Sequence, residues 1–109
     1  KFREENMTSK QRAFLKKEAH NLEPIVRIGK DGLTENIIQS ILDGIKSREL
    51  IKIKVLQNLE ADKEEIREIA EELCGKAGIE LVGIIGKIII VYKENDEKPV
   101  VSNLLKSIK

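Results

Sequence analysis

Residues 50–56 have the sequence Leu-Ile-Lys-Ile-Lys-Val-Leu, which alternates apolar and basic side chains. In a strand, successive side chains point to opposite faces of the sheet, so Lys52 and Lys54 share one face. The other face then receives Ile51, Ile53 and Val55. A parallel strand buried on both faces would be apolar throughout. The alternation therefore predicts a strand that helices cover on one face only, as in a two-layer fold.

Helix and strand signals alternate on both sides of this stretch. Before it we predict a helix capped by Thr8, a strand at 25–28, and a helix capped by Thr34 that ends near Ser47. The strand at 50–56 is followed by a helix capped by Asp62 that ends at Gly75 or Gly78, and then by strands at 79–82 and 87–93. A last helix has Pro99 in its first turn. Helical crossovers make the first three strands parallel, and the short link at 83–86 makes the fourth antiparallel. We read the two isoleucines of that link as packed side chains of a strand-end hairpin.

The expected fold class is α/β. It is a two-layer sandwich with a four-stranded mixed sheet, in the order α-β-α-β-α-β-β plus a C-terminal helix. The 109 residues suit one domain. We assign 1–6 to a polar leader or expression remnant, 7–93 to the domain, and 94–109 to a loop and an amphipathic helix. The apolar stripe of that helix is expected to contain Val100, Val101, Leu104, Leu105 and Ile108.

The composition argues against several classes of function. Three aromatic residues, Phe2, Phe14 and Tyr92, are too few for an aromatic platform that stacks several bases. A single cysteine, Cys74, excludes an internal disulfide, and with His20 it leaves too few ligands for an ordinary zinc site. We therefore expect no metal or cofactor. Because there is no 18-residue apolar run and no signal-peptide core, we expect a cytoplasmic protein that does not enter membranes.

The net charge is only +1, but its distribution is uneven. Residues 7–56 carry 10 Lys and Arg against 6 Asp and Glu, whereas residues 57–109 carry 8 against 11. A molecule polarised in this way can bind a polyanion on one side. A chain with one acidic helix, at 62–78, explains the same numbers equally well.

Gly29-Lys30-Asp31-Gly32 links a predicted strand to a capped helix. Glycine permits positive φ and close approach of a ligand, and a helix N-terminus attracts anions. The segment therefore suits a phosphate of a nucleic-acid backbone, with Lys30 as an added cation. The spacing matches neither a P-loop nor a dinucleotide fingerprint. A plain turn remains the alternative, since G-x-x-G is common by chance.

A basic surface is expected on the side of the sheet that carries Lys52 and Lys54. It is extended by Arg27, Arg48, Lys87 and Lys93. An ordinary solvated face is the alternative interpretation. The first helix offers a second basic cluster on its outer face: Lys10, Arg12, Lys16 and Lys17.

No catalytic site is predicted. His20 stands near the end of the first helix, where a capping or packing role is expected. Cys74 falls within an apolar stripe, which favours an inert thiol. Tyr92 is expected to pack. The carboxylates of the third helix alternate with basic residues on a solvated face. We therefore expect a binding protein and no enzyme.

Three segments in a fixed order carry a family resemblance. Val26-Arg27-Ile28-Gly29-Lys30-Asp31-Gly32-Leu33-Thr34, Glu49-Leu50-Ile51-Lys52-Ile53-Lys54 and Gly86-Lys87-Ile88-Ile89-Ile90-Val91-Tyr92-Lys93 each resemble a signature of the YhbY-like family. The domain of this family is also called CRM, for chloroplast RNA splicing and ribosome maturation. The resemblance covers residues 8–93. Val91 and Lys93 depart from the Leu and Arg of the third signature, and Lys93 cannot form a bidentate phosphate contact.

The resemblance implies a fold like the C-terminal domain of translation initiation factor three, and RNA binding without catalysis. Stand-alone bacterial members associate with precursors of the large ribosomal subunit. We therefore expect a monomer that binds ribosomal RNA during large-subunit assembly, with ribosomal proteins as further partners. The residues expected to bind RNA are Arg27, Gly29, Lys30, Asp31, Gly32, Thr34, Arg48, Lys52, Lys54, Lys87 and Lys93. The alternative function is a protein–protein adaptor that docks through the acidic third helix or the C-terminal apolar stripe.

Overall fold

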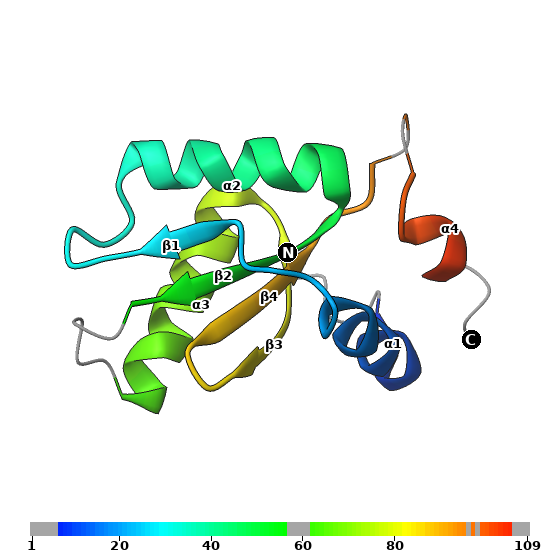
Figure 1. Ribbon diagram of the computed structural model, residues 1–109, viewed down its shortest axis with the longest axis horizontal. Coiled ribbons are helices and arrows are strands. Elements are labelled where there is room, and N and C mark those ends of the chain that lie inside the picture. Colours follow the sequence, from blue (N-terminus) through cyan, green and yellow to red (C-terminus); the bar gives the residue numbers. More distant parts are fainter. Residues whose placement is uncertain (1–6, 57–61, 96, 98, 106–109) are drawn as a thin grey trace.

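A computed structural model of the protein describes residues 7–56, 62–95, 97 and 99–105 (Figure 1). In chain order its elements are α1 (Ser9–Ala19), β1 (Val26–Ile28), α2 (Glu35–Arg48), β2 (Leu50–Val55), α3 (Lys63–Ala77), β3 (Glu80–Ile85), β4 (Ile88–Tyr92) and α4 (Ser102–Leu105). This order confirms the predicted fold class. The leader assigned to 1–6 and Ile108 of the predicted C-terminal stripe lie outside the described residues.

The four strands form one sheet in the order β1-β2-β4-β3. β1 pairs in parallel with β2, and β4 pairs antiparallel with both β2 and β3. The first three strands therefore point the same way and β4 runs against them, as predicted. Although β4 is last in the sequence, it lies inside the sheet between β2 and β3.

The hairpin between β3 and β4 is tighter than predicted. β3 continues past Val82 to Ile85, and only Gly86 and Lys87 form the turn. Gly86 has a φ of 60°, which suits a two-residue hairpin turn. Ile84 packs against the core, whereas Ile85 is 58% exposed, so the prediction that both isoleucines pack is wrong for Ile85.

The helices begin and end at the signals that the sequence contains. Capping boxes open α1 and α3, formed by the pairs Thr8–Gln11 and Asp62–Glu65. In each pair the side chains accept hydrogen bonds from each other's backbone amides, which have no partner inside the helix. α3 ends at Gly78, whose φ is 69°. These local bonds fix the lengths of the helices that pack on the sheet.

Helices α2 and α3 cover one face of the sheet, which is the predicted helical layer (Figure 1). The strands contribute fully buried residues to this core: Ile28, Ile51, Ile53, Val55, Ile89 and Val91. The helices contribute Ile41 and Leu73, which are also fully buried. The apolar side chains that alternate along β2 therefore point toward the helical layer, as predicted.

Helices α1 and α4 cover part of the opposite face, so the prediction that helices cover β2 on one face only is wrong at the end of the strand that holds Leu50. A second core there joins Leu15 and Ala19 of α1 to Leu50, Val82 and Ile90 of the sheet. In Figure 1, α1 lies toward one end of the strands, and the turn between β3 and β4 lies clear of it. The strands are thus buried on both faces at one end and on one face at the other.

Arg12 fixes α1 to the edge of the sheet. Its guanidinium donates hydrogen bonds to the carbonyl oxygens of Leu81, at 2.6 Å, and Val82, at 3.2 Å. The register of β3 shifts between Leu81 and Gly83, and Arg12 contacts carbonyls at this bulge. The prediction that Arg12 lies in a basic cluster on the outer face of this helix is therefore wrong.

Glu49 holds the C-terminal segment against the domain. The side chain is fully buried, and the residue has a φ of 65°, which is uncommon outside glycine. One carboxylate oxygen, Oε1, accepts hydrogen bonds from the amides of Val100, Val101 and Ser102 at 2.7 to 2.9 Å. The other, Oε2, accepts from the Asn95 amide at 2.6 Å and from the Ser102 hydroxyl at 2.8 Å. Two segments far apart in the sequence are thereby joined through one anion.

This arrangement changes the predicted C-terminal helix. The described helix starts only at Ser102, so Pro99 precedes it and does not lie in its first turn. Within the predicted stripe, Leu105 is buried, whereas Val100 and Leu104 are about half exposed. The amides of Val100, Val101 and Ser102 lie just before or at the start of the helix, where a backbone amide has no acceptor inside the helix, and Glu49 supplies that acceptor.

The carboxylate of Glu49 makes the stability of the fold dependent on pH. Burial alone would raise its pKa, but hydrogen bonds from Asn95, Ser102 and Val100 lower it below the ordinary value of 4.5. A pKa that is lower in the folded state adds stability that is fully present above pH 4.5 and is lost as the pH falls through the folded pKa. We expect the free energy of unfolding to decrease in this acid range, and to decrease less in Glu49→Gln. Urea unfolding at neutral and acid pH measures both; equal decreases in the two proteins would contradict this role.

Candidate nucleic-acid interface

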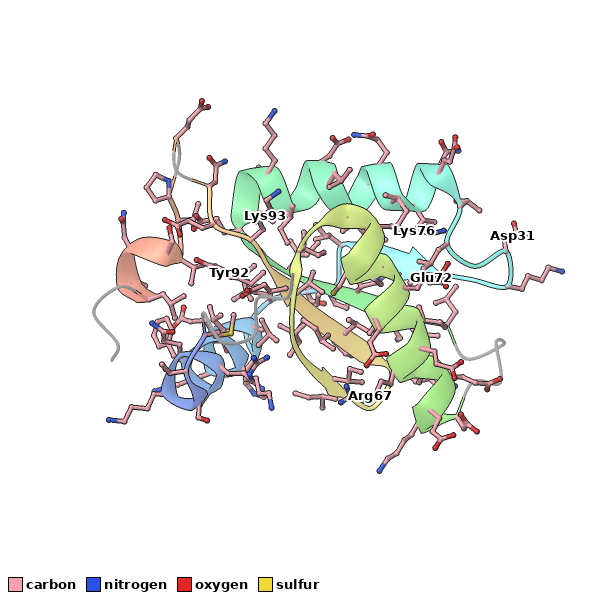
Figure 2. The ribbon with its side chains drawn as sticks, turned by 180° about the vertical axis from the view of Figure 1, so that it is seen from behind. Asp31, Arg67, Glu72, Lys76, Tyr92 and Lys93 are labelled. Atoms are coloured by element: carbon pink, nitrogen blue, oxygen red, sulfur yellow. The ribbon has the colours of Figure 1, made fainter. Side chains whose placement is uncertain are left out.

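The Gly29–Gly32 segment is a tight turn between β1 and α2. The Gly32 amide donates a hydrogen bond to the Gly29 carbonyl at 3.0 Å, and Gly32 has a φ of 74°. Lys30 and Asp31, the two central residues of this turn, are exposed, and Figure 2 shows Asp31 at its tip. Thr34 follows and caps α2, since its Oγ1 accepts from the Ile37 amide at 3.2 Å. A cation therefore stands next to the N-terminus of a 14-residue helix.

A row of residues crosses the sheet next to this turn. Strand pairing places Arg27 opposite Lys54, Lys54 opposite Ile88, and Ile88 opposite Ile85. Paired residues in neighbouring strands share a face, so all four side chains lie on the face that α1 covers only in part. Arg27 is exposed and Lys54 is half-buried. Two cations and two isoleucines thus form one row.

Lys87 lies at the same end of the sheet. Its carbonyl accepts a hydrogen bond from the Val55 amide at 2.8 Å, which places the hairpin turn beside the end of β2. The amide of the next residue, Leu56, donates to the Ile28 carbonyl, directly before the Gly29–Gly32 turn. We call the group Arg27, Lys30, Lys54 and Lys87, together with the Gly29–Gly32 turn, the loop-end surface.

Lys52 has a structural partner. Its Nζ donates a hydrogen bond to the Leu22 carbonyl at 3.0 Å and lies 3.5 Å from the His20 carbonyl. These carbonyls belong to the end of α1 and to the segment that follows it, where the helix dipole favours a cation. Lys52 therefore lies on the predicted face but holds the connection between α1 and β1.

Arg48 and Lys93 lie at the opposite end of the molecule from the loop-end surface. Arg48 is the last residue of α2, and 14 helical residues span about 21 Å. Lys93 follows β4, and its amide donates to the Glu49 carbonyl at 2.9 Å. Figure 2 shows Lys93 and Asp31 near the two ends of α2. The structure therefore divides the predicted site residues into two groups.

Lys16 of α1 is a cation that the predicted site omitted. Its Cε would lie 2.5 Å, and its Nζ 3.3 Å, from a Cβ placed on Gly83. Gly83 pairs with Ile90, one row away from Ile88. The absence of a side chain at Gly83 thus lets Lys16 extend across the sheet. The basic residues of α1 already indicated a second cationic cluster in the sequence, but the sequence alone does not show which strand lies beneath Lys16.

Residues 7–93 match the CRS1/YhbY (CRM) domain, from the capping box of α1 to the end of β4. The chain belongs to this family. The three signature segments of its CRM domain lie on β1, β2 and β4, which are neighbours in the sheet. The match stops before the segment that Glu49 holds.

Relatives of this CRM domain are found in bacteria and archaea. The chain is 44% identical to the "Probable RNA-binding protein YqeI" of Bacillus subtilis over 91 residues, which cover 84% of this chain and 92% of that protein. It is 36% identical to the "Probable RNA-binding protein MJ0652" of Methanocaldococcus jannaschii, over 83% of this chain and 66% of the relative. A solution structure of SAV1595 from Staphylococcus aureus, described as a candidate RNA-binding protein, superposes with a TM-score of 0.69 at 41% identity. That superposition covers 86% of this chain and 98% of SAV1595.

Cys74 and Tyr92 are packed within the fold, and His20 lies at the end of a helix. Burial, with carboxylates at Glu80 and Glu71, raises the pKa of Cys74 to about 12, so the thiol stays protonated at neutral pH. Tyr92 is buried, and burial also raises its pKa. His20 forms the C-terminal cap of α1. Among the residues that the structure describes, no three His, Cys, Asp or Glu side chains gather as a metal site requires. No helix in the same residues is long and apolar enough to cross a bilayer.

The acidic side chains of α3 lie with the helical layer, on the opposite side of the sheet from the row. Glu71 pairs with Arg67 at 3.7 Å, and Glu72 pairs with Lys76 at 3.1 Å (Figure 2). Both pairs are well exposed and join residues four apart on the helix. The fold therefore separates the acidic helix from the row that holds Arg27 and Lys54.

Proposed function

We propose that this protein binds RNA through the loop-end surface and does not act as an enzyme. The observation that carries the proposal is the convergence of four cations, from β1, the following turn, β2 and the hairpin, on one end of the sheet. The relatives named as RNA-binding proteins support it. Lys and Arg contacts with phosphates supply most of the affinity for a nucleic acid.

The glycine turn suits a backbone phosphate for a physical reason. Gly32 takes a positive φ without strain, and a Cβ placed there meets no atom within 4 Å, so the outer side of the turn is open. The N-terminus of α2 adds a partial positive charge. Contacts of this kind position RNA without reading its bases, and the shape of the RNA then determines preference.

We further propose that the bound RNA is ribosomal RNA in precursors of the large subunit. The support is the family resemblance, because stand-alone bacterial members associate with these particles. Crosslinking the protein to RNA in cells and sequencing the fragments tests the identity of the RNA. Enrichment of large-subunit precursor RNA is the expected result, and an even distribution over cellular RNA would contradict it.

The loop-end surface predicts a specific salt dependence. If its four cations each contact one phosphate, the log–log slope of affinity against salt is about −2.8 to −3.6, from about 0.7 to 0.9 per phosphate. Replacing Arg27 and Lys54 by glutamine is expected to flatten the slope by about 1.4 to 1.8. Fluorescence anisotropy over a salt series with a ribosomal RNA fragment measures the slope.

Arg48 and Lys93 provide a matched control for this experiment. The variant Arg48→Gln plus Lys93→Gln removes the same charge from the opposite end of the molecule. We expect its slope to equal that of the wild type, with all folds checked by circular dichroism. If the control flattens the slope as much as the Arg27 and Lys54 variant, the loop-end surface is not the RNA site.

The adaptor function makes a different prediction. Protein partners that dock on α3 would remain bound in cell extracts after RNase treatment, whereas partners joined through RNA would be lost. We expect loss, because the carboxylates of Glu71 and Glu72 already have basic partners on the helix.

A further inference from the structure

The apolar half of the row ends on β3, an edge strand of the sheet. Ile85 is 58% exposed, more than any other large apolar residue described, and it belongs to neither buried core. Ile88, its partner across the hairpin, is half-buried and borders the core beneath α1. Two neighbouring isoleucines therefore form an apolar floor that α1 covers only in part.

Cations lie on both sides of this floor. Lys54 is paired with Ile88 and is followed in the row by Arg27. Lys16 extends over Gly83 in the next row, and Lys87 lies in the turn that joins Ile85 to Ile88. The row itself contains no carboxylate. An apolar surface bordered in this way fits a partner that is anionic and flat.

An unpaired nucleotide has this combination of properties. Neighbouring strands are about 4.8 Å apart, so the four positions from Arg27 to Ile85 span about 14 Å. A phosphate at Arg27 and Lys54 leaves the attached base close to Ile88 and Ile85. In a duplex the base faces are stacked inside the helix and are not available for such a contact.

We propose that Ile85 and Ile88 contact the base of an unpaired nucleotide whose phosphate is bound by Arg27 and Lys54. This inference rests on the proposed function and specifies the RNA as single-stranded at this point. The contact is aliphatic, since the one aromatic residue of the sheet, Tyr92, is buried. An aliphatic contact with a base face does not distinguish one base from another, so sequence preference at this position is weak.

The two halves of the row differ in their dependence on salt. Phosphate contacts at Arg27 and Lys54 weaken as salt rises, because binding releases counterions. Burial of apolar surface at Ile85 does not release counterions. Loss of the isoleucine contact therefore lowers affinity and leaves the salt slope unchanged, which separates it from loss of a cation.

The test uses Ile85→Thr in the full chain, because threonine is also β-branched and suits a strand. The probes are a short oligouridylate, which is single-stranded, and an RNA duplex of similar length. We expect Ile85→Thr to weaken binding of the oligouridylate about three- to tenfold, with an unchanged salt slope. Duplex binding is expected to stay within about twofold of the wild type.

Val100→Thr is the matched control, because Val100 is 50% exposed and belongs to the C-terminal segment held by Glu49. We expect it to bind both RNAs as the wild type does. The proposal is overturned if Ile85→Thr binds the oligouridylate as tightly as the wild type, or loses equal affinity for the duplex. It is also overturned if the variant keeps RNA binding but loses a ribosomal protein in RNase-treated extracts. If the wild type binds neither RNA, the proposed RNA-binding function itself is wrong.

Discussion

Glu49→Gln is expected to lower the free energy of unfolding by about 2 to 4 kcal/mol. The wild-type carboxylate accepts five hydrogen bonds, three at one oxygen and two at the other. Glutamine keeps the shape but replaces one oxygen by an NH2 group, which donates and does not accept. That group then faces either the Asn95 amide and the Ser102 hydroxyl, or three backbone amides if the side chain turns over. The Ser102 hydroxyl can turn and accept from this group, but a backbone amide cannot, so at least one donor faces another donor in either orientation, inside a buried site.

Urea unfolding measures this loss, and hydrogen exchange locates it. We expect the amides of Asn95, Val100, Val101 and Ser102 to exchange faster in the variant, because their acceptor is weakened. Glu97→Gln is the control, since Glu97 is exposed in the same segment and its replacement is expected to change stability by less than about 0.5 kcal/mol. Equal stability of Glu49→Gln and the wild type would show that the carboxylate does not hold the segment.

Leu15→Ala is expected to cost about 2 to 5 kcal/mol. Leu15 is fully buried in the core beneath α1, where it packs with Leu50, Val82 and Ile90. The loss includes the transfer of the side chain and the cavity that remains. α1 has only 11 residues, too few for a stable isolated helix in water, so its structure depends on this packing.

Urea unfolding of Leu15→Ala is compared with Lys17→Ala, a change on the exposed side of the same helix. The control is expected to stay within about 0.5 kcal/mol of the wild type. A cost below about 1 kcal/mol for Leu15→Ala would mean that α1 does not pack against the sheet as described.

Local structure could be predicted from the sequence because its causes are local. Thr8 with Gln11, and Asp62 with Glu65, satisfy amides within three residues of themselves, and Lys52 and Lys54 alternate with buried neighbours. The position of β4 between β2 and β3 has no such local cause. Strand order depends on which edges pair, and several orders are compatible with one pattern of apolar residues.

The sequence predicts which kinds of residue form the candidate site, but only partly where those residues lie in the fold. Arg27, Lys54 and the Gly29–Gly32 turn lie together because each is adjacent to the end of β1 or β2. Arg48 shares their charge, but the length of α2 carries it to the other end of the sheet. The hydrogen bond from Lys52 to the Leu22 carbonyl depends on where the connection between α1 and β1 runs. The residues of that connection do not determine its path through local interactions.

The hydrogen bonds of Glu49 show that the family match and the folded domain end at different residues. The family match ends at residue 93, whereas the hydrogen bonds of Glu49, a residue inside the match, reach Asn95 and Ser102. A protein shortened to the matched region would keep the buried anion and lose all five of its donors. The unit that folds therefore extends beyond the unit that sequence comparison recognises, and an expression boundary for this protein belongs after Leu105, the last described residue of α4.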